Sequence, residues 1–459
     1  MNLFLTNSFS QQIEKFIPTN LKGVSMYVCG PTVYDRPHLG NVRSAVVYDV
    51  LFRILRYLYP KVIYVRNITD IDDKIITTAK RQNLSIQDLT NRMTKLYHQD
   101  VEALNCLPPT IEPKASEHIK DMISMIQDLI NLDYAYVEEG HVLFDTTKYP
   151  DYGKLSKRNL DDLIAGSRVE VAPIKKHPTD FVLWKPTKTG EECCFFASPW
   201  GNGRPGWHIE CSAMSKVHLS ENFDIHGGGV DLLFPHHENE LAQSKCANPD
   251  SNFAHFWVHN GFLTINGEKM SKSSGNFTTA HEVLEAGLPG SVLRYFYLTT
   301  HYRKPLDFNK KSIDDSYKAV ERFTEALNVN GMQDPRETQQ HDKKIDEDFL
   351  MALLNDMNTP SALAYLHTLA DKGLRQDSER ATQLILCSRF LGLDLFAFTR
   401  KTAFIPQNIV DLAELRQKAK EERNWEQADV LRDTIEKMGY LVQDKPGTFV
   451  LKKLPPQII

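Results

Sequence analysis

The sequence contains no apolar run close to the length of a membrane span. A span needs about 18 consecutive apolar residues, and no stretch of the 459-residue chain approaches that length. The first residues carry neither a basic region nor a long apolar segment, so no signal peptide is predicted. We therefore expect a protein without membrane association.

Cysteine and excess positive charge are also scarce. The seven cysteines are an odd number scattered along a long chain, which argues against a disulfide framework. This pattern favours reduced thiols and metal ligands, and with them a cytoplasmic protein. The net charge is −5, so any nucleic-acid site must be a local basic patch.

Two common phosphate-binding motifs are missing. No GK[ST] sequence is present, because Gly267 is followed by Glu268 and Lys269. Residues 201–206 match GxGxxG formally, but no clear strand precedes them. Pro205 also removes a backbone donor that a phosphate cradle needs. We interpret this segment as a loop.

A strand, a tight loop and a helix are predicted near the N-terminus. Residues 24–29 alternate in hydrophobicity, and residues 30 and 31, Gly-Pro, end the strand. From residue 47 to 58 apolar residues recur at helical steps. A second unit follows, with a strand at 62–68 and a helix that Thr69 or Asp70 would cap. Two successive βα units predict a parallel, nucleotide-binding type of sheet, which binds ligands at its carboxyl edge.

The rest of the chain divides into segments that differ in their pattern of apolar and polar residues. Short strands are predicted near 136–137 and 141–144, within a segment that we interpret as an insertion. Residues 223–226 predict another short strand, and the three glycines at 227–229 a flexible turn. From about 310 onwards the pattern is helical, and a linker near Pro406 precedes a charged helical hairpin.

Four scattered residues suit a metal ion. His236 and Glu240 are four apart on one helical face, and Cys29 and Cys211 could end at the same sheet edge. Two thiols and an imidazole are ligands typical of zinc. Taken singly, each cysteine is more simply a small buried hydrophobe, and His236 a hydrogen-bonded polar residue.

Lysines form a second candidate site. Lys269 and Lys272, in the string KMSKS, could clamp a polyphosphate, although a solvated lysine loop is the simpler interpretation. The string is paired with an upstream His-x-Gly, at His38 and Gly40. A helix entrance of this kind attracts phosphate through its free N–H groups.

These motifs resemble those of the class I aminoacyl-tRNA synthetases, and most closely those of the cysteinyl-tRNA synthetase family. The resemblance spans about residues 24–450, and its specific pieces are MYVCGPTVYDRPHLGN, RNITDIDDKI, YPDYGKLSKRNLDDL, GWHIECSAM, GGGVDLLFPHHENELAQS, GEKMSKSSGN, HYRKPLDF and, more weakly, WEQADVLRD.

The resemblance implies a set of site residues. The zinc ligands of the family fall on Cys29, Cys211, His236 and Glu240. Its catalytic residues fall on His38, Lys269 and Lys272. The same three residues, with Gly40, Asn41 and Asp231, would bind ATP, and Cys29, Thr69 and Trp207 would bind the amino acid.

One position departs from the family pattern. The first signature, usually HIGH, ends here in Asn41 rather than histidine. Asparagine forms hydrogen bonds but carries no positive charge. A role for His38 is therefore kept, and a charge-based role for the second histidine is not implied.

The resemblance also implies an architecture: a Rossmann-type α/β catalytic domain with an insertion, then an all-α bundle and a small C-terminal domain. We expect a discontinuous catalytic domain at 1–135 and 200–268, a connective insertion at 136–199, a KMSKS region at 269–309, a helical bundle contacting tRNA at 310–400, and a small anticodon-binding domain at 408–459. From Asp411 to Ile459 there are nine Lys/Arg and nine Asp/Glu, so a solvated hairpin explains that charge equally well.

The implied activity is ATP-dependent ligation of L-cysteine to tRNA(Cys) through cysteinyl-adenylate. It would use about one Zn²⁺ per chain, with Mg²⁺ bound to ATP, and we expect a monomer. A ligase that passes cysteine to a small-molecule amine would share both signatures. Such a ligase would not need the helical region that follows residue 310. A non-catalytic zinc or RNA-binding protein would not need His38, Lys269 and Lys272.

Overall fold

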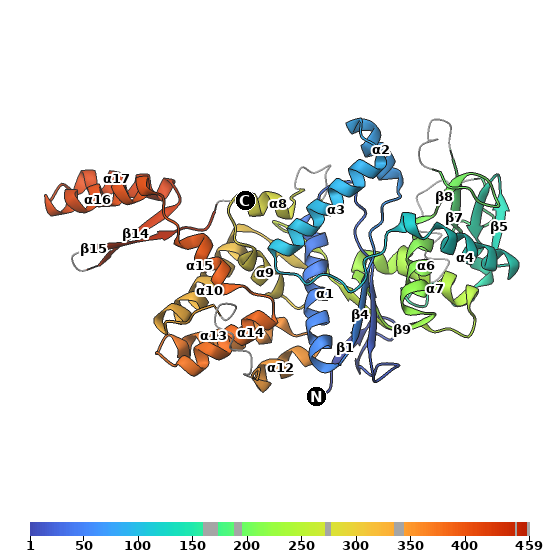
Figure 1. The fold of residues 1–459 in the computed structure, drawn as a ribbon, viewed down its shortest axis with the longest axis horizontal. Helices are drawn as coiled ribbons and strands as arrows, with labels where there is room; N and C mark the ends of the chain where they lie inside the picture. The colour runs from blue at the N-terminus through green and yellow to red at the C-terminus, as the bar shows by residue number, and fades with distance from the viewer. Residues whose placement is uncertain (159–172, 188–194, 271–276, 335–343, 446–447, 457–459) are drawn as a thin grey trace.

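The computed structural model describes residues 1–158, 173–187, 195–270, 277–334, 344–445 and 448–456. A four-stranded parallel sheet lies at the centre of its N-terminal half (Figure 1). The strand order is β10 (Phe253–Asn260), β9 (Asn222–Gly229), β3 (Val24–Val28) and β4 (Val62–Arg66). All three pairings are parallel, which confirms the predicted α/β class.

Both faces of this sheet are buried. Met26 and Val28 pack with α1 (Leu39–Leu58) in one hydrophobic cluster. Tyr27, on the other face, packs with α4 (Ile119–Asn131), α6 (Trp207–Leu219) and α7 (Glu238–Ala247). Helices on both faces are typical of parallel sheets, and they leave the carboxyl edge of the strands as the place for a site.

The glycine run at 227–229 is part of β9 and not the flexible turn that the sequence suggested. A Cβ at Gly227 would lie 2.3 Å from Cε1 of Tyr48, a residue of α1. The Tyr48 hydroxyl lies 2.8 Å from the carbonyl oxygen of Gly228 and 2.6 Å from that of Val258. Glycine is therefore needed because a buried tyrosine approaches the strand closely.

The predicted insertion forms most of an antiparallel sheet, whose last strand lies beyond its predicted end at residue 199. The strand order is β5 (Ala135–Glu138), β6 (His141–Phe144), β7 (Phe181–Pro186) and β8 (Gly203–Pro205). Strand β8 pairs with β7 and carries part of the GxGxxG string. The prediction that residues 201–206 form a loop is therefore wrong for residues 203–205. A dinucleotide-binding turn follows a parallel strand, whereas β8 is an antiparallel edge strand. The GxGxxG string is therefore not a dinucleotide-binding motif here.

Shorter elements surround the central sheet. The hairpin β1 (Phe4–Asn7) and β2 (Gln12–Lys15) precedes it, and α2 (Asp73–Gln82), α3 (Ile86–Ala103) and the 3-10 turn η1 (Ala115–Glu117) follow β4. Asp72 caps α2, in place of the expected Thr69 or Asp70. The connection into the helical part contains β11 (Leu263–Ile265), β12 (Glu268–Lys269), α8 (Ala280–Glu285), α9 (Gly290–Leu298) and β13 (Leu306–Phe308).

The helical part packs directly on the α1 side of the sheet. It comprises α10 (Lys310–Val329), α12 (Glu347–Leu354), α13 (Thr359–Gly373), α14 (Ser378–Phe390) and α15 (Leu395–Ala403). One hydrophobic cluster runs through α1, α9 and these helices. Within it, Arg294 of α9 forms a fully buried ion pair with Asp49 of α1 and donates to the carbonyl oxygen of Leu104 at 2.9 Å.

The C-terminal segment has a small core of its own and projects from the bundle (Figure 1). It consists of α16 (Gln407–Glu421), α17 (Trp425–Lys437) and the hairpin β14 (Tyr440–Lys445) and β15 (Thr448–Lys453). Among the described residues, no single helix is long and apolar enough to cross a membrane. The pair Ser378–Phe390 and Leu395–Thr402 passes that test jointly but is bent by 97°.

Candidate active site

The four predicted metal ligands come together at the carboxyl edge of the sheet. Cys29 follows the last residue of β3, Cys211 lies in α6, His236 lies in the short turn η4 (Leu233–His237) and Glu240 in α7. Their ligand atoms all lie within 4.8 Å of one another. The Cys29 Sγ is 3.6 Å from the Cys211 Sγ and 3.4 Å from the Glu240 Oε1, and the His236 Nε2 is 3.0 Å from that same oxygen.

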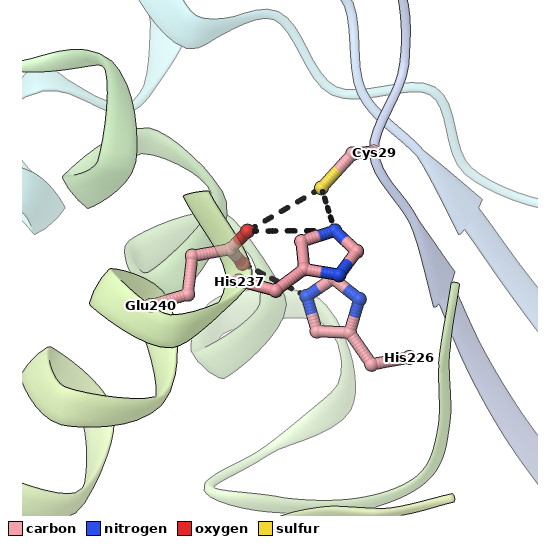
Figure 2. Close-up of side chains that lie close together, drawn as sticks. All are labelled: Cys29, His226, His237 and Glu240. Atoms are coloured by element: carbon pink, nitrogen blue, oxygen red, sulfur yellow. Dashed lines mark hydrogen bonds and ion pairs between the residues drawn. The ribbon is translucent and has the colours of Figure 1, made fainter. Parts of the chain in front are cut away.

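A second set of four shares two members with the first. Figure 2 shows Cys29, His226, His237 and Glu240 pointing toward one another from β9, η4, α7 and the end of β3. His237 Nε2 lies 3.4 Å from the Cys29 Sγ, and His226 Nε2 lies 2.8 Å from the Glu240 Oε2. Sequence reasoning missed both histidines, although His237 adjoins His236 and His226 ends a predicted strand.

Charge is balanced tightly in the first set. Burial raises the pKa of Glu240, but His226 and His236 outweigh it and hold that pKa well below its usual value. Burial also raises the pKa of the Cys211 thiol, yet the hydrogen bond from Cys29 lowers it to about 6. Burial lowers the pKa of His236, and Glu240 with Cys211 raises it to about 10. The neighbouring groups therefore stabilise the charged forms of Glu240, Cys211 and His236.

This arrangement fits a zinc ion chemically. Thiolate, imidazole and carboxylate are ordinary zinc ligands, and Cys211, His236 and Glu240 are almost completely buried. A buried cluster of negative groups requires a compensating cation, and a zinc ion would supply that charge. His237 differs, because burial and the neighbouring His226 hold its pKa well below the usual value.

Besides Cys29, which belongs to this cluster, two further residues are predicted to bind the amino acid. Trp207 is 40% exposed and its ring stacks on His236 with 4.1 Å between ring centres. Thr69 is buried, and its hydroxyl donates to the Glu210 Oε2 at 3.0 Å. Sequence reasoning missed Glu210, whose pKa is raised well above the usual value by burial and then by Cys211. Its place directly before Cys211 was the only signal.

The first signature forms the beginning of α1. His38 is the N-cap, and its Nδ1 accepts from the backbone N–H of Gly40 at 3.1 Å and of Asn41 at 3.2 Å. Asn41 Oδ1 in turn accepts from the His38 N–H at 3.2 Å, which completes a capping box. A neutral His38 thus carries its proton on Nε2. Asn41, the departure from the family pattern, has a structural role here.

Only the first two residues of the second signature are described. Lys269 lies in β12 with its Nζ 5.9 Å from the centre of the Phe262 ring. Lys272 lies outside the described residues. Residues 277 and 278 contact the first signature. The Leu39 N–H donates to the carbonyl oxygen of Thr278 at 3.2 Å, and the Phe277 and His38 rings form a T-shaped pair. Asp231 is exposed in the turn η3 (Val230–Leu232) after β9, the neighbour of β3.

Comparisons with known proteins agree with this arrangement. Residues 15–318 match the model of the tRNA synthetases class I (C) catalytic domain. The cysteine–tRNA ligase of Pelagibacter ubique is 46% identical over 461 residues, covering 98% of this chain and 99% of its own. The chain belongs to the cysteine–tRNA ligase family. Another member, from Methylocella silvestris, is 47% identical over 99% of this chain and 100% of its own.

The fold has solved relatives outside the cysteine–tRNA ligases. The methionyl-tRNA synthetase of Mycobacterium tuberculosis, solved with bound methionyl-adenylate, matches with a TM-score of 0.51 at 14% identity. The match covers 83% of each chain. At this identity the likeness concerns the fold, which is that of the class I synthetases.

Proposed function

We propose that this protein ligates L-cysteine to tRNA(Cys) at the expense of ATP. The observation that carries the proposal is the group of Cys29, Cys211, His236 and Glu240 at the carboxyl end of β3, the strand that leads into α1 and its His38 signature. The chain that holds this group is 46% identical, over nearly its whole length, to a cysteine–tRNA ligase. A thiol-binding metal group next to a phosphate-binding helix N-terminus is the combination that cysteine activation needs.

In the first step, a carboxylate oxygen of cysteine attacks the α-phosphorus of ATP, and pyrophosphate leaves with the bonding electrons. Such a transfer depends mainly on positioning and charge stabilisation. His38 would donate from Nε2 to the phosphate oxygens at the α1 N-terminus, where Gly40 and Asn41 hold its ring. Lys269 and Lys272 would hold the β- and γ-phosphates with Mg²⁺, and Asp231 would accept from a ribose hydroxyl.

In the second step, the terminal ribose 2′-hydroxyl of the tRNA attacks the carbonyl carbon of the adenylate and AMP leaves. Thr69 and Trp207 would border the amino acid, one buried beside Glu210 and one stacked on His236. Zinc held by Cys29, Cys211, His236 and Glu240 would bind the substrate sulfur and favour its thiolate. Of the four ligands, Glu240 is the one we expect to yield to substrate.

We also propose that the parts of the chain divide this work. Residues 1–135 and 200–268 would form the catalytic domain, which the KMSKS region at 269–309 would complete with Lys269 and Lys272. The segment 136–199 would connect the two parts of the catalytic domain. Residues 310–400 would contact the tRNA stem, and residues 408–459 would bind the anticodon. The last assignment is supported by the small core that the C-terminal segment forms by itself, because such a core makes the segment a separate unit.

The test is cysteine-dependent exchange of pyrophosphate into ATP, followed by transfer to a defined acceptor. We expect exchange with cysteine and charging of tRNA(Cys). Exchange that leads to charging of a small amine but not of tRNA would identify the other ligase. A lack of any cysteine-dependent exchange would refute the proposal.

A further inference from the structure

Two histidines outside the candidate active site face each other. His118 directly precedes α4, and His218 lies in the last turn of α6. Their Nε2 atoms are 3.2 Å apart, and their ring centres are 4.9 Å apart with the planes at 81°. Both side chains are partly buried.

These distances match two imidazoles that share one metal ion. Nitrogens bound at about 2.0–2.1 Å to a tetrahedral zinc ion lie about 3.3 Å apart, with ring centres about 5 Å apart. The observed values are 3.2 and 4.9 Å. A straight N–H···N hydrogen bond of the same length would separate the ring centres by about 5.5 Å. The rings are therefore tilted away from the line that joins their nitrogens, as two ligands of one metal ion must be.

A carboxylate supports one of these rings from behind. Asp121 Oδ2 lies 2.9 Å from the His118 Nδ1. Metal-binding histidines typically donate their second ring N–H to such a carboxylate, which fixes the tautomer and raises the basicity of the ligating nitrogen. His118 would then present the lone pair of its Nε2 toward His218.

The surroundings of His218 favour its neutral form, which is the form that binds a metal ion. Burial, and then the neighbouring His118, lower the pKa of His218. The carbonyl end of α6 is favourable for positive charge. The nearby Lys216 is engaged elsewhere, because its Nζ lies 3.1 Å from Glu221 Oε1 and 2.9 Å from Asn248 Oδ1.

We propose that His118 and His218 form a second metal site, which takes a divalent cation of the zinc type with water completing its coordination. The site would fasten α6 to the segment around η1. That segment is tied to the loop after β4, because the Ser116 N–H donates to the Asp70 Oδ1 at 2.9 Å. Helix α6 also carries Trp207 and Cys211. The ion would therefore link α6 to the loop after β4, and both segments border the candidate active site.

The experiment is equilibrium dialysis of the zinc-loaded, full-length protein against added Zn²⁺, with metal analysis and thermal unfolding. We expect the wild type to take up one further zinc and to unfold at a higher temperature. His118→Ala and His218→Ala should each abolish this second uptake and keep the first zinc. Asp121→Asn should weaken the second uptake about 10- to 100-fold.

The matched control is His255→Ala, because His255 is exposed and lies on β10, in another part of the chain. It should leave the second uptake unchanged. Cysteine-dependent pyrophosphate exchange without added zinc should be equal in all these variants, which shows that they are folded. A wild type that binds a single zinc, or a second zinc that survives in both His118→Ala and His218→Ala, would overturn the proposal. Equal loss in His255→Ala would assign the uptake to adventitious surface binding and overturn it as well.

Discussion

His226 Nε2 lies 2.8 Å from Glu240 Oε2, while the other oxygen of that carboxylate faces Cys29 and His236. One residue of β9 thus orients a proposed ligand that is carried by α7. Groups that orient metal ligands typically affect affinity about 10- to 100-fold. We therefore expect His226→Gln to lose zinc faster than the wild type in dialysis against a chelator. His255→Gln is the control, and equal zinc retention in the two variants would contradict this role of His226.

The two overlapping sets of ligands make opposite predictions. If Cys29, Cys211, His236 and Glu240 hold the zinc, Cys211→Ser should lower the bound zinc well below one per chain, and His237→Asn should retain it. Cobalt substitution adds a spectroscopic measure, because two thiolates give stronger sulfur-to-metal absorption than one. Zinc retained in Cys211→Ser but lost in His237→Asn would assign the ion to the set that contains His226 and His237.

The proposed phosphate-binding lysines are tested by activation alone. Lys269→Ala and Lys272→Ala should each lower the rate of cysteine-dependent pyrophosphate exchange about 10²- to 10³-fold, the usual cost of losing one preorganised donor. The unfolding temperature should stay unchanged, because Lys269 is exposed. Lys311→Ala, an exposed lysine of α10, serves as the control. Exchange at the wild-type rate in the Lys272 variant would remove this loop from the mechanism.

The C-terminal segment should be separable from activation. A chain that ends at Phe404 keeps α15 and loses α16, α17, β14 and β15, whose core is their own. We expect wild-type pyrophosphate exchange and strongly reduced charging of tRNA. Contacts such as Lys452 Nζ to Glu325 Oε1, at 2.9 Å, are exposed and contribute little. Loss of both activities together would show that the segment stabilises the catalytic part.

The sequence predicted those features that repeat or have a fixed spacing. The parallel sheet followed from two βα units, and His236 with Glu240 followed from a helical step of four. His226, Glu210 and His237 were missed because a single buried polar residue has no period. Their importance comes from contacts between distant segments, such as that of Thr69 with Glu210.

Local signals failed where tertiary contacts decide the outcome. The glycines at 227–229 suggested a turn, but the approach of Tyr48 from α1 explains them within a strand. Asp70 suggested a helix cap, but it accepts from Ser116 instead, and Asp72 caps α2. In both places the contact that decides the structure comes from a residue distant in sequence: Tyr48 for the glycines and Ser116 for Asp70.

The last prediction concerns the choice between cysteine and serine. The two amino acids differ by sulfur against oxygen, and a pocket that relies on packing alone separates such a pair by only about 10²-fold. A zinc-binding group separates them further, because a thiol ionises readily on zinc and forms a soft bond, while the serine hydroxyl is harder and far less acidic. We therefore expect strong rejection of serine without hydrolytic editing.

The measurement is steady-state pyrophosphate exchange with each amino acid, in the wild type and in Glu240→Ala. Glu240 supports both the metal group and, through His226 and His236, its charge balance. We expect the variant to lose much of its preference for cysteine, whereas Lys269→Ala should lower both rates and keep their ratio. Activation of serine within about tenfold of cysteine by the wild type, or rapid hydrolysis of seryl-tRNA by it, would refute selection by the metal group.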